Sequence, residues 1–103
     1  MTGDHPLVGR SAPDLEFEDG KRLGEYCHDG RALLFDFVDD ARISTLGVRW
    51  RGRLNVITTR LKEKSDLTAL FVRPDGFVAW AADREIDLDR AASALSMWLG
   101  NSE

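Results

Sequence analysis

Cysteine and histidine are scarce in this sequence. Its 103 residues include one cysteine, Cys27, and two histidines, His5 and His28. A single thiol excludes an internal disulfide and any redox cycle between two cysteines of one chain. His5 has no cysteines or carboxylates around it at metal-ligand spacing, so we predict no metal site. His28 follows Cys27 directly, and neighbouring side chains on a helix point about 100° apart, so we expect no imidazole-activated thiol.

Long apolar runs are also absent. No stretch approaches the roughly 20 residues that a membrane-spanning helix needs. The first ten residues, MTGDHPLVGR, lack the basic start and the apolar stretch of a secretory signal. These absences predict a cytoplasmic protein with no membrane partner.

Positive charge is in the minority. There are 14 lysines and arginines against 18 aspartates and glutamates, and the net charge is -4. Nucleic-acid binding needs a concentrated basic face. The one basic cluster, Arg49, Arg51 and Arg53, has the alternate spacing of solvated side chains at a helix end and a strand start. We therefore predict no nucleic-acid partner.

The composition is that of an ordinary globular protein, with 43% hydrophobic and 31% charged residues. A chain of this length can bury a hydrophobic core but is too short for a second domain. We therefore predict a single domain over residues 1–103, with its core between about residues 6 and 100.

The middle of the chain alternates between strand and helix patterns. Residues 31–38 are apolar on both faces, which predicts a central strand, typically parallel to a neighbour. Residues 54–59 form a second apolar strand. Between them, an apolar stripe over residues 41–50 predicts a helix whose first turn Asp40 can cap. Earlier in the chain, Leu15 to Phe17 has the alternation of a short strand.

The last third predicts a hairpin and a closing helix. Residues 67–73 and 77–82 are expected strands, joined by a turn in which proline fixes the first dihedral and glycine accepts a positive one. The residues of that turn are Pro74, Asp75 and Gly76. Asp87 then caps a helix with a continuous apolar stripe that includes Trp98, and Gly100 ends it.

Together with a short helix expected at residues 22–27, the predicted order is β, short α, β, α, β, a β-hairpin and a closing α. A right-handed crossover between the two central strands then gives an α/β fold. Its centre is a mixed sheet of about four to five strands with helices on both faces.

The segment LVGRSAPDLEFEDGKRL resembles the opening of thioredoxin-like and peroxiredoxin proteins. Combined with LTALFVRPDGFVAW and DLDRAASALSMWLG, it is similar to the C-terminal domain of FAD-dependent aromatic-ring hydroxylases, the phenol-hydroxylase and aromatic-polyketide monooxygenase group. The resemblance runs from about Pro6 to Gly100. It implies a thioredoxin-like fold with the C-terminal hairpin and helix described above.

The resemblance also implies a domain that works without chemistry of its own. In that family the domain contributes structure or subunit contacts, while FAD and substrate lie in larger preceding domains. No GxGxxG follows a predicted strand here, so we predict no cofactor in this chain and FAD only in a partner or a missing domain. The implied partners are a second copy, as a homodimer, or a flavoprotein monooxygenase.

The junction after residues 31–38 agrees with that implication. A thioredoxin-like enzyme places its nucleophilic cysteine there, where a helix N-terminus lowers the thiol pKa. This sequence has Asp39 and Asp40 instead. Carboxylates suit a helix N-terminus but do not attack disulfides. We expect a structural cap and no catalytic residue.

Two other functions stay open. One is a stand-alone enzyme of the thioredoxin or peroxiredoxin class that uses Cys27, although this cysteine precedes the central strand instead of following it. The other is a module that binds a small aromatic ligand against Trp50 or Trp80. The apolar last strand also suggests an interface at Phe77, Val78 and Trp80, because an uncharged edge strand tends to associate unless it is covered. Trp98 is expected in the core.

Overall fold

The computed structural model describes residues 7–26, 30–50, 52–63 and 65–100. The elements in chain order are the 3₁₀ helix η1 (Leu23–Tyr26), strand β1 (Ala32–Asp36), helix α1 (Ala41–Gly47), the 3₁₀ helix η2 (Val48–Trp50), strands β2 (Leu54–Thr58), β3 (Leu67–Val72) and β4 (Val78–Asp83), and helix α2 (Leu88–Leu99).

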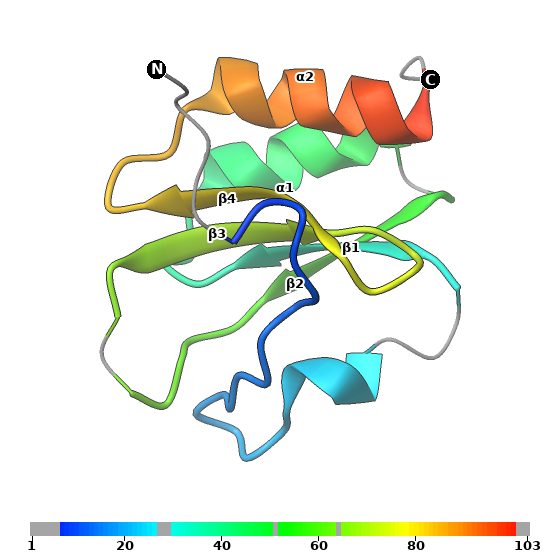
Figure 1. Ribbon diagram of the computed structural model, residues 1–103. Helices are drawn as coiled ribbons and strands as arrows, with labels where there is room; N and C mark the ends of the chain where they lie inside the picture. Colours follow the sequence, from blue (N-terminus) through cyan, green and yellow to red (C-terminus); the bar gives the residue numbers. More distant parts are fainter. Residues whose placement is uncertain (1–6, 27–29, 51, 64, 101–103) are drawn as a thin grey trace.

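The four strands form one mixed sheet with the order β2-β1-β3-β4 (Figure 1). The central strand β1 is parallel to β2 and antiparallel to β3, and β3 is antiparallel to β4. All five residues of β1 are buried, as the pattern of apolar residues on both faces predicted. The predicted α/β class and the mixed sheet are confirmed.

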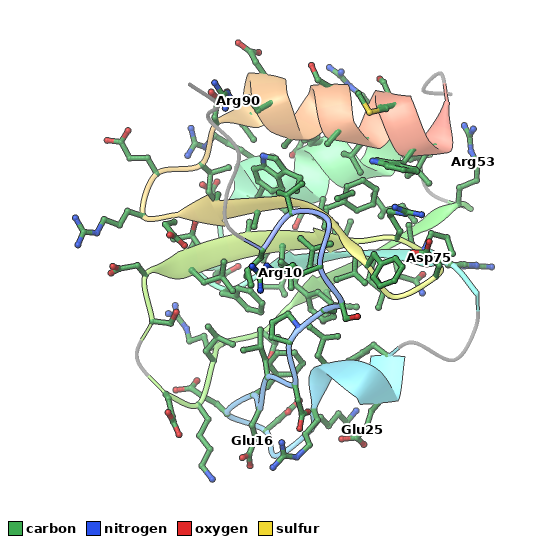
Figure 2. All side chains as sticks on the ribbon, in the orientation of Figure 1. Arg10, Glu16, Glu25, Arg53, Asp75 and Arg90 are labelled. Atoms are coloured by element: carbon green, nitrogen blue, oxygen red, sulfur yellow. The ribbon has the colours of Figure 1, made fainter. Side chains whose placement is uncertain are left out.

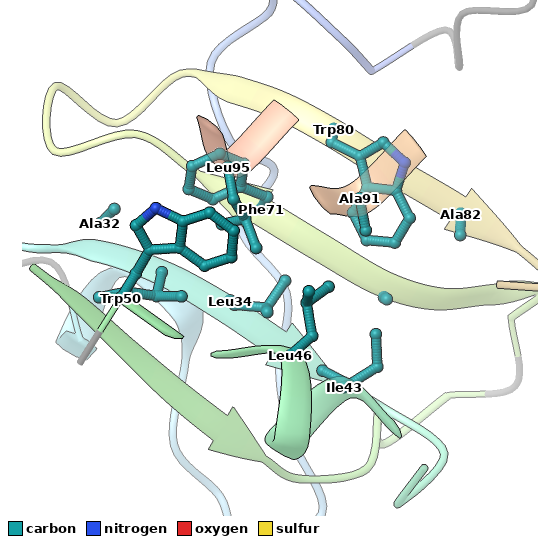
Figure 3. Packing of buried hydrophobic residues seen from close by; sticks show 12 residues of the cluster. Ala32, Leu34, Ile43, Leu46, Trp50, Phe71, Trp80, Ala82, Ala91 and Leu95 are labelled. Carbon is teal, nitrogen blue, oxygen red and sulfur yellow. The ribbon is translucent and has the colours of Figure 1, made fainter. Parts of the chain in front are cut away.

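Both α-helices pack on one face of the sheet (Figure 1). They enclose a core of aliphatic and aromatic side chains from β1, β3, β4, α1 and α2 (Figure 3). Trp50 is fully buried there, and its indole Nε1 donates a hydrogen bond to the carbonyl of Gly100 at 3.0 Å. This bond joins η2 to the end of α2.

The chain between residues 7 and 26 covers the opposite face, with η1 as its helical part (Figure 1). Phe17 is buried at the centre of this second core. Its ring centroid lies 5.6 Å from that of Phe35, 6.0 Å from Phe37 and 5.8 Å from Tyr26. On this face, aromatic side chains fill the core under an N-terminal segment that is mostly irregular, whereas α1 and α2 cover the other face.

The strand expected around Leu15 to Phe17 does not form. This segment makes only isolated bridges, Glu16 with Arg22 and Phe17 with Leu61. The chain reverses at Gly20, where φ is +88°, so no partner runs alongside it for more than one residue pair. The expected helix at residues 41–50 is also shorter, because α1 ends at Gly47 and tightens into η2.

Strand β4 is the edge of the sheet, and the chain covers the beginning of that edge itself. Gly9 N–H donates to the carbonyl of Val78 at 2.9 Å, and Val78 N–H donates to the carbonyl of Arg10 at 2.8 Å. Ala12 N–H reaches the carbonyl of Gly76 at 2.8 Å. Residues 9–12 thus satisfy backbone groups that would otherwise attract another strand.

Within the described ranges, no helix combines the length and the apolar character needed to cross a membrane.

Candidate functional site

The β1–α1 junction holds three carboxylates, from Asp36, Asp39 and Asp40. Asp40 is the N-cap of α1, and its Oδ1 accepts the N–H of Arg42 at 2.9 Å. The guanidinium of Arg42 turns back to Asp40 Oδ2 at 2.7 Å. This side-chain bond, followed by the backbone bond, lowers the pKa of Asp40. Asp39 has a φ of +55°, a left-handed conformation that Asp tolerates better than most residues.

Asp36 is the residue that the sequence analysis missed. It is fully buried, and its two oxygens accept backbone N–H groups, Oδ1 from Val38 at 3.1 Å and Oδ2 from Asp40 at 2.8 Å. Burial raises the pKa of Asp36 in spite of these two bonds. The available signal was a carboxylate at the end of the apolar run ALLFD, where an isolated charge is expensive unless it has partners.

The chemistry of this junction is that of a cap. The carboxylates of Asp36 and Asp40 accept backbone N–H groups, and Asp39 lies in the turn between them with a positive φ. Among the described residues, no three histidine, cysteine or acidic side chains are grouped to hold a metal. The junction therefore holds the chain between β1 and α1 in shape.

A small hollow beside the junction offers no better site. It is lined by Val38, Asp40, Arg42, Arg84, Glu85 and Ile86. Both arginines there already pair with carboxylates, Arg42 with Asp40 and Arg84 with Asp66 at 3.4 Å.

The larger hollow is an open groove of about 700 Å³ between α2 and β4, bordered by Val8 and Gly9. Its most unusual member is Arg73, whose guanidinium carbon lies 3.9 Å from the ring centroid of Trp98 and 5.8 Å from that of Phe77. A guanidinium on an aromatic ring at this distance makes a cation–π contact. Met97 extends the groove along α2.

The hairpin turn at Pro74, Asp75 and Gly76 fixes the position of Arg73. Asp75 forms an ion pair with the Arg73 guanidinium and accepts the N–H of Phe77 at 3.2 Å. Gly76 has a φ of +90° and donates its N–H to the carbonyl of Arg73 at 2.9 Å. Figure 2 labels Asp75 at this hairpin and Arg90 in the first turn of α2.

The three residues suggested as an interface have different surroundings. Val78 is buried in the core under the N-terminal segment, and Trp80 is buried against the helices. Phe77 alone keeps a large exposed fraction, 41%. An interface at this strand stays a prediction, and Phe77 is the member that a partner can reach from outside.

The structure corrects the position of one tryptophan and limits the role of another. Trp98 was expected in the core but is 45% exposed, because its ring lies over Arg73 at the rim of the groove and not under α2. Trp50 is fully buried, so it offers no ring face to an aromatic ligand. Cys27, His28 and His5 lie outside the described residues, and the thiol alternative stays untested.

The second cap expected from the sequence, Asp87, has the geometry of a cap. It is the N-cap of α2, and its Oδ1 accepts the N–H of Arg90 at 3.2 Å. Gly100 follows the helix with a φ of +82°.

The mixed sheet, the two α-helices on one of its faces and the hairpin before α2 define a thioredoxin-like α/β domain with no thiol at its β1–α1 junction. Residues 5–102 match the family model described as aromatic-ring hydroxylase, C-terminal. The chain belongs to this family of C-terminal domains.

Relatives agree in sequence and in structure. A monooxygenase of Claviceps purpurea is 37% identical over 92% of this chain and 19% of its own length. The 12-dehydrotetracycline 5-monooxygenase/anhydrotetracycline 6-monooxygenase of Streptomyces rimosus is 36% identical over 97% of this chain and 22% of its own length. The solved anhydrotetracycline hydroxylase of Streptomyces rimosus superposes with a TM-score of 0.89 at 35% identity, over 100% of this chain and 23% of that one. The chain therefore spans about a fifth of the relatives it matches.

Proposed function

We propose that this chain is a non-catalytic thioredoxin-like domain that stabilises or assembles a FAD-dependent aromatic-ring hydroxylase, acting on aromatic polyketide-like substrates. The observation that supports the proposal most is the β1–α1 junction. Where a thiol enzyme of this fold has its nucleophile, Asp40 caps the helix and Asp36 accepts two backbone N–H groups. The open groove between α2 and β4, with Trp98 and Arg73 at its rim, is a surface on which a partner can bind.

The described residues do not fit FAD. A flavin pyrophosphate binds best at a helix N-terminus with free N–H groups and small residues nearby. Here Asp40 already accepts an N–H group at the start of α1, and Asp87 accepts one at the start of α2, so these donors have their acceptors within the chain. In the proposal, FAD and the substrate therefore belong to the remaining part of the enzyme, and this domain contacts that part or a second copy of itself.

A domain exchange tests the proposal. The matched C-terminal part of the Streptomyces rimosus anhydrotetracycline monooxygenase would be replaced by residues 5–102 of this chain. Bound flavin and conversion of anhydrotetracycline would be measured for the exchanged enzyme, for the native enzyme, and for a truncated enzyme that ends before the match.

We expect the exchanged enzyme to retain flavin and turnover near the native level, and the truncated enzyme to lose both. An exchanged enzyme as inactive and flavin-poor as the truncated one would overturn the proposal. A truncated enzyme with native flavin content, turnover and thermal stability would do so as well, because the domain would then have nothing to stabilise.

A further inference from the structure

We infer that the flavin-bearing part of the hydroxylase docks on the face formed by β4 and α2, with Arg73, Phe77, Met97 and Trp98 at the centre of the contact. We call these four residues the aromatic face. This inference rests on the proposed function, and it adds the surface and the partner that the function itself leaves open.

Exposure supports the choice of this face. Among the described residues, five large hydrophobic side chains are exposed, and three of them belong to the aromatic face: Met97 at 77%, Trp98 at 45% and Phe77 at 41%. The other two lie on other parts of the chain, Val38 just after β1 and Val48 at the start of η2. Apolar side chains gathered in this way mark an interaction site more often than scattered ones do.

The chemistry of the aromatic face is that of a binding hot spot. Tryptophan, other aromatic residues, methionine and arginine are enriched at the centres of protein interfaces. Arg73 is held before any partner arrives, by Asp75 on one side and by the Trp98 ring on the other. Because its conformation is already fixed, little side-chain entropy remains to be lost on binding.

The path of the chain indicates which partner docks. The family is one of C-terminal domains and the match begins at residue 5, so the larger part of each relative joins the domain at this end. Val8 and Gly9 line the groove, so the described residues nearest to that connection lie at the groove. A tethered partner has an effective concentration in the millimolar range, so the preceding part of the same enzyme is favoured over a second copy.

The partner surface follows from the groove. It should present an apolar patch to Met97 and Trp98, with a backbone carbonyl or a carboxylate near Arg73. A guanidinium has only N–H donors, and an oxygen of this kind is a good acceptor for them.

The exchanged enzyme provides the test, with Met97→Lys as the variant and Val48→Lys as its matched control. Met97 is the most exposed of the group, so its replacement leaves the isolated domain folded, and a lysine near a helix C-terminus is favourable. Val48 is also exposed, at 54%, but lies outside the groove. The readout is the rate of limited proteolysis at the connection before residue 7, which docking protects.

We expect Met97→Lys to speed this cleavage roughly tenfold, a loss of about 1.4 kcal/mol of docking free energy. Phe77→Lys should act in the same direction, and Val48→Lys should leave the rate unchanged. The isolated chains should unfold at equal urea concentrations in the Met97→Lys and unsubstituted forms.

Equal cleavage of the Met97→Lys and Val48→Lys enzymes, in an exchanged enzyme that is active and retains flavin, would overturn the inference while the proposed function stands. Sedimentation of the isolated chain as a dimer that Met97→Lys converts to a monomer would also overturn it, because the occupant would then be a second copy. An inactive, flavin-poor exchanged enzyme would instead overturn the proposed function.

Discussion

At the scale of single residues, the carboxylate of Asp36 shows how the junction keeps its shape. It is fully buried at the end of β1, and it accepts the N–H groups of Val38 and Asp40. Without it, two backbone donors in the turn that leads to α1 would lose their partner, and an unpaired buried donor costs about 1–3 kcal/mol. The residue therefore orders the segment in which Asp39 has a positive φ.

The raised pKa of Asp36 makes this role visible in the pH dependence of stability. Because burial raises the pKa above its ordinary value of 3.8, the folded protein binds that proton more tightly than the unfolded chain does. The stability that the proton supplies is complete below 3.8 and is lost as the pH rises through the raised pKa. In the Asp36→Asn variant this position does not titrate, so its contribution to stability does not change with pH.

The expected result is that the free energy of unfolding of the unsubstituted protein, minus that of Asp36→Asn, falls as the pH rises from below 3.8 towards neutrality. Urea unfolding at several pH values measures the difference. The depressed pKa of Asp40 contributes with the opposite sign, and it largely cancels because both proteins contain it. A difference that stays constant or grows with pH would contradict the assignment.

Sequence patterns predicted the two helix caps at this scale, because a cap is a local arrangement of one side chain and the next few N–H groups. The same patterns did not identify the buried carboxylate of Asp36 and placed Trp98 wrongly in the core, because the surroundings of both residues depend on distant parts of the chain. Trp98 has the spacing of a core residue on α2, but its ring lies on Arg73, a residue of the β3–β4 hairpin. The periodicity of one helix cannot predict a contact with a residue of another element.

At the scale of elements, α1 lies unusually close to β2. A Cβ added at Gly47 would come within 2.2 Å of Val56 Cγ2, far inside van der Waals contact. The glycine is needed here for close approach and not for its backbone angles. It allows the short helix to pack directly on the strand that follows it.

Gly47→Ala should therefore destabilise the domain by about 1–3 kcal/mol, in spite of the better helix propensity of alanine. Gly24→Ala is the control, since nothing lies within 4 Å of the added Cβ there. Val56→Ala should partly rescue Gly47→Ala by removing the clashing methyl group, which a double-mutant cycle in urea measures. Strict additivity of the two changes would count against this packing.

Helix α2 depends on its cap. Removing the Asp87 carboxylate leaves the N–H of Arg90 without that acceptor, and loss of a cap costs about 1 kcal/mol. Asp87→Ala should lower the free energy of unfolding by this amount, and Asp87→Asn, which can still cap, by much less. Equal losses for the two variants in thermal or urea unfolding would show that the cap is not the source of the effect.

Most elements could be predicted from the sequence because their signals are local. The buried run of β1, the proline–glycine turn of the hairpin and the apolar stripe of α2 each fix one element. The segment around Phe17 could not be predicted, because its alternation fits a strand but the structure provides only single bridge partners, Arg22 and Leu61, for its residues. The groove also arises only when α2, β4 and residues 8–9 come together.

At the scale of the whole molecule, the chain is an α/β domain of the aromatic-ring hydroxylase C-terminal family, with carboxylates at its β1–α1 junction. Two cores, one under the helices and one under the N-terminal segment, hold the sheet from both sides. What remains exposed and organised is the aromatic face. In the proposal, this face contacts the part of a hydroxylase that binds FAD.

The most direct test of the central claim is the turnover per bound flavin of the exchanged hydroxylase with Asp39→Gly. Glycine accepts the φ of +55° at this position, so the substitution removes the carboxylate beyond β1 without straining the backbone. If the domain does no chemistry, anhydrotetracycline hydroxylation per bound flavin will equal that of the unsubstituted exchanged enzyme. A tenfold or larger loss at unchanged flavin content and thermal stability would contradict the account, because this carboxylate would then act in the reaction.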